Sequence, residues 1–284
     1  MHIYIKKAKY SGYCFGVSRA IKLAEDILKK NHGKKTKIFT LGPIIHNPGV
    51  TNKLEKKGLI SVENLEEIIP GSIFIIRSHG MPPLLVNEIK KKNIKIIDAT
   101  CPFVKKAQAR AKDLSKNGYF VAIVGNRDHP EVIGIKSHVL NKNYVIIEDE
   151  ANAGKITIKE KIGVVVQTTQ PMEKLCLITG KLLEKTKELI VFNTICNTTR
   201  RRQSSTKKLA NSVDMMIVVG GRNSANTKHL VEISKKCSAL TYHIENYKEI
   251  KSQWFNNIKK VGISGGASTP VEDIIDVEEA IKKL

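Results

Sequence analysis

Short apolar runs of strand length alternate with amphipathic stretches along the whole chain. Between the runs, a helical stretch follows Cys196, and residues 16–30, 83–92, 102–117, 171–187, 224–236 and 271–283 show helical periodicity. Strands are predicted at Ile3–Ile5, Ile38–Leu41, Ile73–Ile76, Ile94–Ile97, Tyr119–Val124, Tyr144–Ile147, Ile162–Val166, Leu189–Phe192, Met215–Val219 and Val261–Ile263. Strands that alternate with helices predict an α/β fold with parallel sheets.

Three of the five cysteines occupy equivalent places in this pattern. Cys14, Cys101 and Cys196 each follow a predicted strand and precede a helix, at spacings of 87 and 95 residues. Parallel sheets bind ligands beyond the carboxyl ends of their strands, and helix N-termini favour a thiolate. We therefore expect three small α/β units to bring three thiolates to one centre. Cys176 and Cys237 fall inside helical stretches and are interpreted as small buried or half-buried apolar side chains.

The chemistry of such a centre is left open by the spacing alone. Three thiolates are suited to zinc with a further ligand, or to an iron–sulfur cluster with one iron not bound by protein. The absence of a C-x-x-C motif also leaves the possibility of three unrelated buried cysteines. The odd number of cysteines argues against a disulfide framework and indicates a reducing compartment.

Polar residues gather in turns that follow strands. These turns are residues 41–48, 77–80, 125–131, 167–171, 220–227 and 265–270. Their His, Ser and Asn side chains and the N–H groups at helix starts are suited to an anionic group such as a diphosphate. Glu131, in a His-Pro-Glu turn, is either a proton donor near a metal or a carboxylate at a favourable helix start.

The net charge of +21 bears on which partners the protein could bind. It comes from 48 Lys and Arg against 27 Asp and Glu, and reflects either codon bias or attraction for an acidic partner or phosphorylated substrate. Aromatic residues make up only 5%, which argues against nucleic acid. No dinucleotide-binding or Walker motif is present, so electrons for a redox reaction would have to come from a protein.

No apolar run approaches a membrane span and no signal peptide is evident, so a soluble protein without a membrane partner is expected.

Taken together, these motifs resemble the 4-hydroxy-3-methylbut-2-enyl diphosphate reductase family across about residues 3 to 275. The resemblance is carried by residues 12–17, 45–47, 78–80, 98–102, 129–131, 167–169, 193–196, 223–224 and 266–268. It implies three similar α/β domains in a trefoil with a pseudo-threefold arrangement around a central cluster cavity. It also implies a [4Fe-4S] cluster on Cys14, Cys101 and Cys196, with the substrate hydroxyl oxygen on the fourth iron.

The resemblance further implies the roles of the polar turns. The catalytic residues would be Glu131 as proton donor, Thr168 beside it, and His129. The substrate-binding residues would be His46, His79, His129, Thr168, Ser224, Asn226 and Ser268. The reaction would remove the hydroxyl group and give isopentenyl and dimethylallyl diphosphate, the last step of the non-mevalonate isoprenoid pathway.

The expected domains are residues 13–100, 101–195 and 196–284, joined by an N-terminal strand in residues 1–12. The expected electron donor is an acidic protein such as ferredoxin or flavodoxin. The expected compartment is a plastid stroma, with a transit peptide removed, or a bacterial cytoplasm. Two alternatives are a basic zinc-containing binding protein and a zinc-dependent hydrolase of phosphorylated small molecules.

Three features need a structural account. Ala225 stands where many members of the family have a second serine, and Asn193 stands where aspartate is commoner. Arg200 to Arg202 place three cations at a helix start, where the dipole disfavours them. We interpret these arginines as solvated surface, with a possible role in docking an acidic electron donor.

Overall fold

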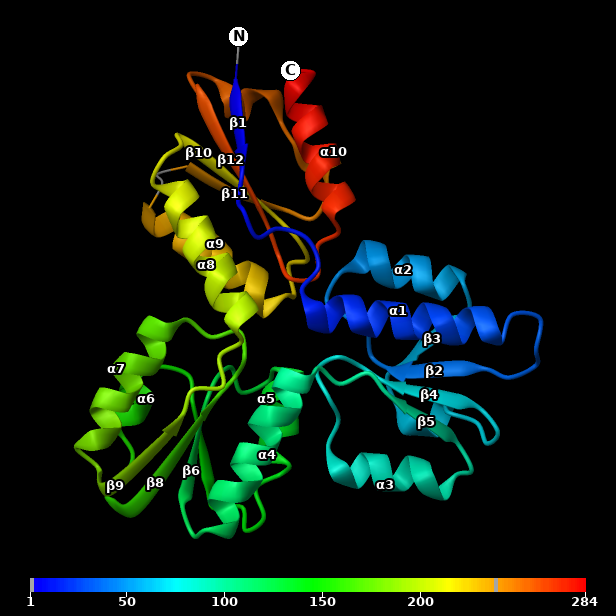
Figure 1. The fold of residues 1–284 in the computed structure, drawn as a ribbon, viewed down its shortest axis with the longest axis vertical. Helices are drawn as coiled ribbons and strands as arrows, with labels where there is room; N and C mark the ends of the chain where they lie inside the picture. Colours follow the sequence, from blue (N-terminus) through cyan, green and yellow to red (C-terminus); the bar gives the residue numbers. More distant parts are fainter. Residues whose placement is uncertain (1–2, 238–239) are drawn as a thin grey trace. The chain divides into compact units, whose positions relative to one another are not determined.

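The computed structural model describes residues 3–237 and 240–284, shown in Figure 1. The strands are β1 (Tyr4–Lys7), β2 (Ile38–Leu41), β3 (Leu59–Val62), β4 (Ile73–Ile76), β5 (Lys95–Asp98), β6 (Phe120–Val124), β7 (Tyr144–Ile147), β8 (Lys159–Val166), β9 (Thr186–Phe192), β10 (Met215–Val219), β11 (Leu240–Ile244) and β12 (Lys260–Gly265). The α-helices are α1 (Phe15–Lys30), α2 (Pro48–Lys56), α3 (Pro83–Lys91), α4 (Pro102–Lys116), α5 (Pro130–Lys136), α6 (Glu150–Gly154), α7 (Met172–Leu183), α8 (Asn197–Ala210), α9 (Ala225–Cys237) and α10 (Val271–Lys282). Short 3-10 helices occupy Leu65–Glu67, Tyr247–Glu249 and Ser252–Phe255.

These strands form three four-stranded sheets in which every pair is parallel. Sheet A has the order β11-β10-β12-β1, sheet B has β3-β2-β4-β5, and sheet C has β7-β6-β8-β9. Numbered within each sheet, all three have the order 2-1-3-4. In sheet A the fourth position is taken by β1, from the other end of the chain, which pairs Tyr4 with Lys260. The expected α/β fold with three similar parallel units is confirmed.

Alternating side chains of each strand fill two layers of core, as sheet C illustrates. Val121 and Ile123 of β6 pack on one face with α4 and α5, while Ala122 and Val124 pack on the other with α6 and α7. A strand covered on both faces is apolar throughout, which is why β6 and the end of β8 are continuous apolar runs.

The other two sheets are layered in the same way (Figure 1). In sheet A, Met215, Ile217 and Val219 of β10 face α10, and Met216 and Val218 face α8 and α9. In sheet B, Phe74 and Ile76 of β4 belong to the core that includes Ile89 of α3. The helices named in these clusters therefore bury apolar side chains against their own sheets.

The described residues form two compact units. The first contains residues 1–17, 46–50 and 197–284 within its bounds, and the second contains residues 18–45 and 51–196. Sheet A lies in the first unit, and sheets B and C lie in the second.

Some predicted element boundaries differ from those observed. The strands β3 and β11 and the helices α2, α5 and α6 are additional to the predicted elements. These are short elements, of four to nine residues, and give little periodic signal. The helix expected over residues 171–187 ends at Leu183, because β9 begins at Thr186.

Among the described residues, no helix combines the length and the apolar character that crossing a membrane requires.

Candidate active site

The three cysteines singled out by their spacing all follow the fourth strand of a sheet. Cys14 comes after β1, Cys101 after β5 and Cys196 after β9, and each is followed at once by a helix. All three have intermediate exposure, and none forms a disulfide among the described residues. The fourth strand of each sheet therefore delivers one thiol to the N-terminus of a helix, where the thiolate is favoured.

Each cysteine is also tied to its own sheet by one equivalent hydrogen bond. Its backbone N–H donates to a carbonyl oxygen in the loop that follows the third strand of that sheet. The N···O distances are 2.9 Å for Cys14 to Ala267, 3.0 Å for Cys101 to Ser78, and 3.0 Å for Cys196 to Thr168. The loop after the third strand carries predicted substrate-binding residues in every sheet, so each thiol is held beside one of these loops.

A side-chain to backbone hydrogen bond stabilises two of the turns that precede the cysteines. Asp98 at the end of β5 accepts the N–H of Thr100 at 2.9 Å, and Asn193 after β9 accepts the N–H of Ile195 at 3.2 Å. In both cases an Asx side chain closes a turn three residues before the cysteine. The amide oxygen of Asn193 therefore makes the bond that an aspartate would make, which accounts for asparagine at this position.

In the first unit, the turn that carries Cys14 is fixed by a buried arginine. Arg202 of α8 is 2% exposed, and its guanidinium donates to the carbonyl oxygens of Gly12 and Gly265, both at 2.7 Å. Burial lowers the pKa of Arg202, while attraction to Cys14 acts in the opposite direction. A cation close to Cys14 favours its thiolate. The Val17 N–H also lies 3.5 Å from the Cys14 sulfur at the start of α1.

Arg202 thus corrects the interpretation of all three arginines as solvated surface. Arg200 and Arg201 are exposed, but Arg202 is buried. In the structure, the buried positions of α8 include Thr199, Arg202 and Thr206 at helical spacing. One face of α8 must pack on the first unit, and Arg202 lies on that face.

The prediction that Cys176 is buried or half-buried is wrong. Cys176 is exposed, because α7 packs on its sheet through Leu175, Ile178 and Leu182, and position 176 points away from that stripe. Cys237 is half-buried and packs beside a small core cluster, as expected.

In the second unit, a buried carboxyl group lies beside the Cys196 loop. Glu131 is 2% exposed, and its carboxylate oxygens accept the Thr168 N–H at 2.6 Å and the Thr168 hydroxyl at 2.9 Å. Burial raises the pKa of Glu131 to about 7, although both bonds from Thr168 lower it. A carboxyl group with this pKa can hold a proton near neutral pH and release it during a reaction.

Two imidazole rings extend this polar cluster of the second unit. His129 is the N-cap of α5, and its Nδ1 accepts the N–H of Glu131 at 3.1 Å. An accepting Nδ1 places the proton of the neutral ring on Nε2. The rings of His79 and His129 meet edge to face, with centroids 5.6 Å apart. His79 follows Ser78, the hydrogen-bond partner of Cys101, so these contacts run from one cysteine turn of the unit to the other.

In the first unit, predicted anion-binding residues lie at the start of α9. The Ser224 hydroxyl accepts the Thr227 N–H at 3.3 Å, as an N-terminal cap does. Asn226 is 3% exposed, and both its amide nitrogen and its amide oxygen lack a hydrogen-bond partner among the described residues. A buried amide without partners is costly unless a ligand satisfies it. Together with the free N–H groups of a helix start, it is suited to an anion.

His46 and Ser268 lie together in the same unit. The Ser268 hydroxyl donates to the His46 carbonyl oxygen at 3.0 Å. Asn47, which is 5% exposed, donates from its amide nitrogen to the Ser268 carbonyl oxygen at 3.0 Å and accepts the Val50 N–H at 3.1 Å. The sequence pattern did not single out Asn47 as a structural residue, although it lies in the quoted Ile-His-Asn motif.

The turn after β10 approaches His46 so closely that only glycine fits. A Cβ atom on Gly221 would lie 2.5 Å from the His46 carbonyl oxygen. Gly220 has a φ of +146° and would meet the side chains of Thr269 and Thr227. The two glycines therefore allow the loops after β10 and β12 to pack against residues 46–47.

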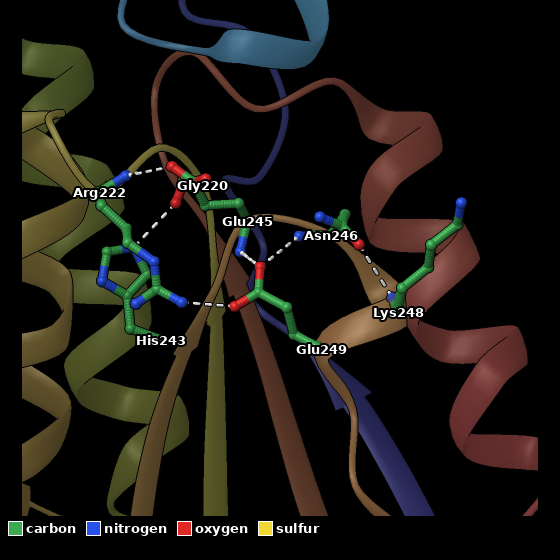
Figure 2. A network of polar contacts seen from close by, with 7 residues as sticks. All are labelled: Gly220, Arg222, His243, Glu245, Asn246, Lys248 and Glu249. Carbon is green, nitrogen blue, oxygen red and sulfur yellow. Dashed lines mark hydrogen bonds and ion pairs between the residues drawn. The ribbon is translucent and has the colours of Figure 1, made fainter.

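A network of polar contacts stabilises the loop between β10 and α9 through the segment that contains residues 243–249 (Figure 2). The Arg222 N–H donates to Glu245 at 2.7 Å, and its guanidinium pairs with Glu249, which also accepts the Glu245 N–H at 2.7 Å. The His243 Nε2 lies 2.8 Å from the Gly220 carbonyl oxygen, which can only accept, so this nitrogen carries the proton. Protein contacts thus fix the backbone that leads into α9.

Comparison with known proteins agrees with the resemblance seen in the sequence. The model of the family described as LytB protein matches residues 5–282. The 4-hydroxy-3-methylbut-2-enyl diphosphate reductase of Aquifex aeolicus is 45% identical, with 98% of this chain and 95% of the relative covered. The enzyme of the same name from Geotalea daltonii is 47% identical, with 97% of each chain covered.

Two solved structures are similar over the full chain. One, described as (E)-4-hydroxy-3-methyl-but-2-enyl diphosphate reductase, the terminal enzyme of the non-mevalonate pathway, is 44% identical, with a TM-score of 0.72 and coverage of 99% of this chain and 100% of that one. The other, the E-1-hydroxy-2-methyl-but-2-enyl-4-diphosphate reductase from Plasmodium falciparum, is 31% identical, with a TM-score of 0.92 and coverage of 100% and 88%. The predicted enzyme class, an oxidoreductase, is confirmed by these relatives, and the chain belongs to the LytB protein family.

Proposed function

We propose that the chain reduces 4-hydroxy-3-methylbut-2-enyl diphosphate to isopentenyl and dimethylallyl diphosphate, the last step of the non-mevalonate isoprenoid pathway. The substrate takes up two electrons and two protons, its C–O bond breaks, a C–H bond forms and water leaves. The observation that carries this proposal is the buried Glu131, which is bonded to Thr168, the same residue whose carbonyl oxygen holds the Cys196 N–H. These contacts support a role for Glu131 as a proton donor beside a cysteine turn.

The donor set of the three cysteine turns fits an iron–sulfur cluster. Cys14, Cys101 and Cys196 are partly exposed thiols at helix starts and form no disulfide among the described residues. Soft thiolate ligands favour such clusters. We propose that these three residues hold a [4Fe-4S] cluster. When bound, the cluster supplies electrons and a Lewis-acidic iron that no cysteine occupies.

Glu131 and Thr168 are proposed to deliver the proton to the departing hydroxyl group. With its pKa near 7, the Glu131 carboxyl group is protonated in a large fraction of molecules at neutral pH. A protonated Glu131 donates to the Thr168 hydroxyl, which can pass a proton to a substrate oxygen on its other side. His129 keeps the proton on Nε2, so it is proposed to donate that N–H to the substrate.

The diphosphate is proposed to bind the polar turns after the first and third strands of the sheets. Asn226 supplies an amide that has no partner among the described residues, and Ser224 and the start of α9 supply further donors. We assign the remaining contacts to His46, His79, His129, Thr168 and Ser268. Ala225 is the first residue of α9, so it contributes its N–H but no hydroxyl group.

We further propose three domains in a trefoil, at residues 13–100, 101–195 and 196–284, with residues 1–12 adding a strand. The repeated 2-1-3-4 strand order supports this division. The proposed electron donor is an acidic protein such as ferredoxin or flavodoxin. For the compartment, a plastid stroma and a bacterial cytoplasm both stay predictions, and the 45–47% identity with bacterial relatives supports the latter.

The iron and sulfide content of anaerobically purified protein tests the proposal, followed by an assay with the allylic diphosphate. We expect a brown protein with about four irons and four sulfides per chain. With reduced methyl viologen it should convert the substrate to the two diphosphate products. A colourless protein that contains one zinc, resists cluster reconstitution and shows no reductase activity would contradict the proposal and favour the zinc-dependent alternatives.

A further inference from the structure

A strongly basic groove lies in the first unit, between the N-terminal segment and α8. Its volume is about 740 Å³, and six cationic side chains line it: Lys6, Lys7, Lys9, Arg200, Arg201 and Lys208. All six are exposed, and none of the described residues that line the groove is acidic. Lys7 forms an ion pair with Glu278 outside the groove, so most of the positive charge faces solvent.

The two walls of the groove are joined by a direct hydrogen bond. The Lys9 N–H donates to the Ser205 hydroxyl oxygen of α8 at 2.8 Å. Ser205 itself lines the groove, as do Tyr10 and Asn197. The cations are thus presented from two fixed backbone segments, which gives the groove a defined shape.

Helix α8 contributes both to the groove and to the turn that carries Cys14. On one face of α8, Arg202 is buried and bonds the Gly12 carbonyl oxygen, two residues before Cys14. On the other face, Arg200 and Arg201 are exposed and line the groove. A partner in the groove would therefore lie close to the turn that carries Cys14, one of the proposed cluster ligands.

We propose that this groove docks the acidic iron–sulfur protein that supplies electrons, an inference that rests on the reductase function proposed above. Each turnover requires two electrons, and the chain has no dinucleotide-binding or Walker motif that would indicate a bound nucleotide donor. Two reduced donor molecules, each oxidised by one electron, supply both electrons in successive encounters. A cationic groove without carboxylates attracts an acidic protein and increases its rate of association. Nucleic acid is disfavoured, because Tyr10 is the only aromatic side chain among the described residues that line the groove.

Charge reversal at the groove, measured with two electron donors, tests the proposal. The variant R200E/R201E and the control K34E/K35E change the net charge equally, and Lys34 and Lys35 are exposed in the turn between α1 and β2. Each holoenzyme is assayed with a reduced, acidic plant-type ferredoxin, and separately with reduced methyl viologen. The small viologen needs no docking surface, so it reports the active site alone.

We expect R200E/R201E to raise the KM for ferredoxin about tenfold or more, within the range of electrostatic steering. Its activity with methyl viologen and the behaviour of K34E/K35E should stay near wild type. Raising the salt concentration should raise the wild-type KM for ferredoxin and affect the groove variant much less.

Equal KM values for the two variants would overturn the groove as the docking site, whether both were raised or both unchanged. A wild-type holoenzyme inactive even with methyl viologen would overturn the proposed function, and the docking proposal with it. A full loss of viologen activity in R200E/R201E alone would also overturn the docking proposal, because the arginines would then act on the active site.

Discussion

Replacement of Glu131 by glutamine tests whether the buried carboxyl group of Glu131 is protonated in the folded protein or charged like an ordinary carboxylate. Glutamine has the shape of the protonated acid: its oxygen can accept the Thr168 N–H, and its nitrogen can donate to the Thr168 hydroxyl oxygen. The E131Q variant should therefore fold and bind substrate, because both contacts are retained. It cannot release a proton, so we expect it to lose most turnover.

The same substitution should alter the pH dependence of stability, in a direction that follows from the pKa. The unfolded chain releases the Glu131 proton around pH 4.5, whereas the folded chain keeps it until about pH 7. Between these values the unfolded state binds fewer protons, so wild-type stability falls as pH rises. A shift from 4.5 to about 7 corresponds to roughly 2 to 3 kcal/mol lost between pH 5 and pH 8. Glutamine does not titrate, so the free energy of unfolding of E131Q should not show this fall between pH 5 and pH 8.

Anaerobic thermal unfolding of both proteins from pH 5 to pH 8 measures the effect. The melting temperature of E131Q relative to wild type should rise by roughly 5 °C over this range. The matched control is E272Q, because Glu272 occupies the second position of α10 as Glu131 does in α5, but it is exposed. E272Q should show little change relative to wild type.

Two results would refute this reasoning. A constant difference in melting temperature between E131Q and wild type would mean that Glu131 is ionised throughout, like a surface carboxylate. Near-normal turnover of E131Q would remove Glu131 from the proton-donor role, whatever its pKa.

Four further substitutions have distinct expected outcomes. T168V removes a hydrogen bond that lowers the pKa of Glu131, so the pH above which activity falls should move upward in a pH–rate profile. R202A leaves two buried carbonyl oxygens without their partner and should cost about 3 kcal/mol in stability, with loss of iron measured on the purified protein. N226A should raise the KM for substrate without lowering the melting temperature, because the amide has no partner among the described residues. C101S should lose the cluster, and full iron content in that variant would contradict the proposed ligand set.

Local pattern was sufficient to predict much of the fold and the polar turns. Buried parallel strands are continuous apolar runs, so β6, β8 and β10 were recognisable from sequence alone. Short or half-buried elements lack that signal, and β3 and β11 were missed for this reason. The predicted substrate residues follow the first or third strand of a sheet, where the topology of open α/β sheets places ligands.

Burial of individual polar side chains could not be read from local pattern. Arg202 and Cys176 were both misassigned, because the side of a helix that faces the core depends on how the helix packs. The role of Asn193 also became clear only from its bond to the Ile195 N–H. The pKa of Glu131 depends on the removal of water by residues from several elements, which no motif encodes.

The sequence by itself determined the alternation of strands and helices, the placement of three cysteines at strand-to-helix turns, and the family. These properties follow from local periodicity and from motifs of a few residues. Only the tertiary structure decided that β1 completes sheet A beside β12, and that each cysteine N–H bonds the loop after the third strand of its own sheet. Such contacts join residues 23 to more than 250 positions apart, and their formation depends on the free energy of packing the whole domain.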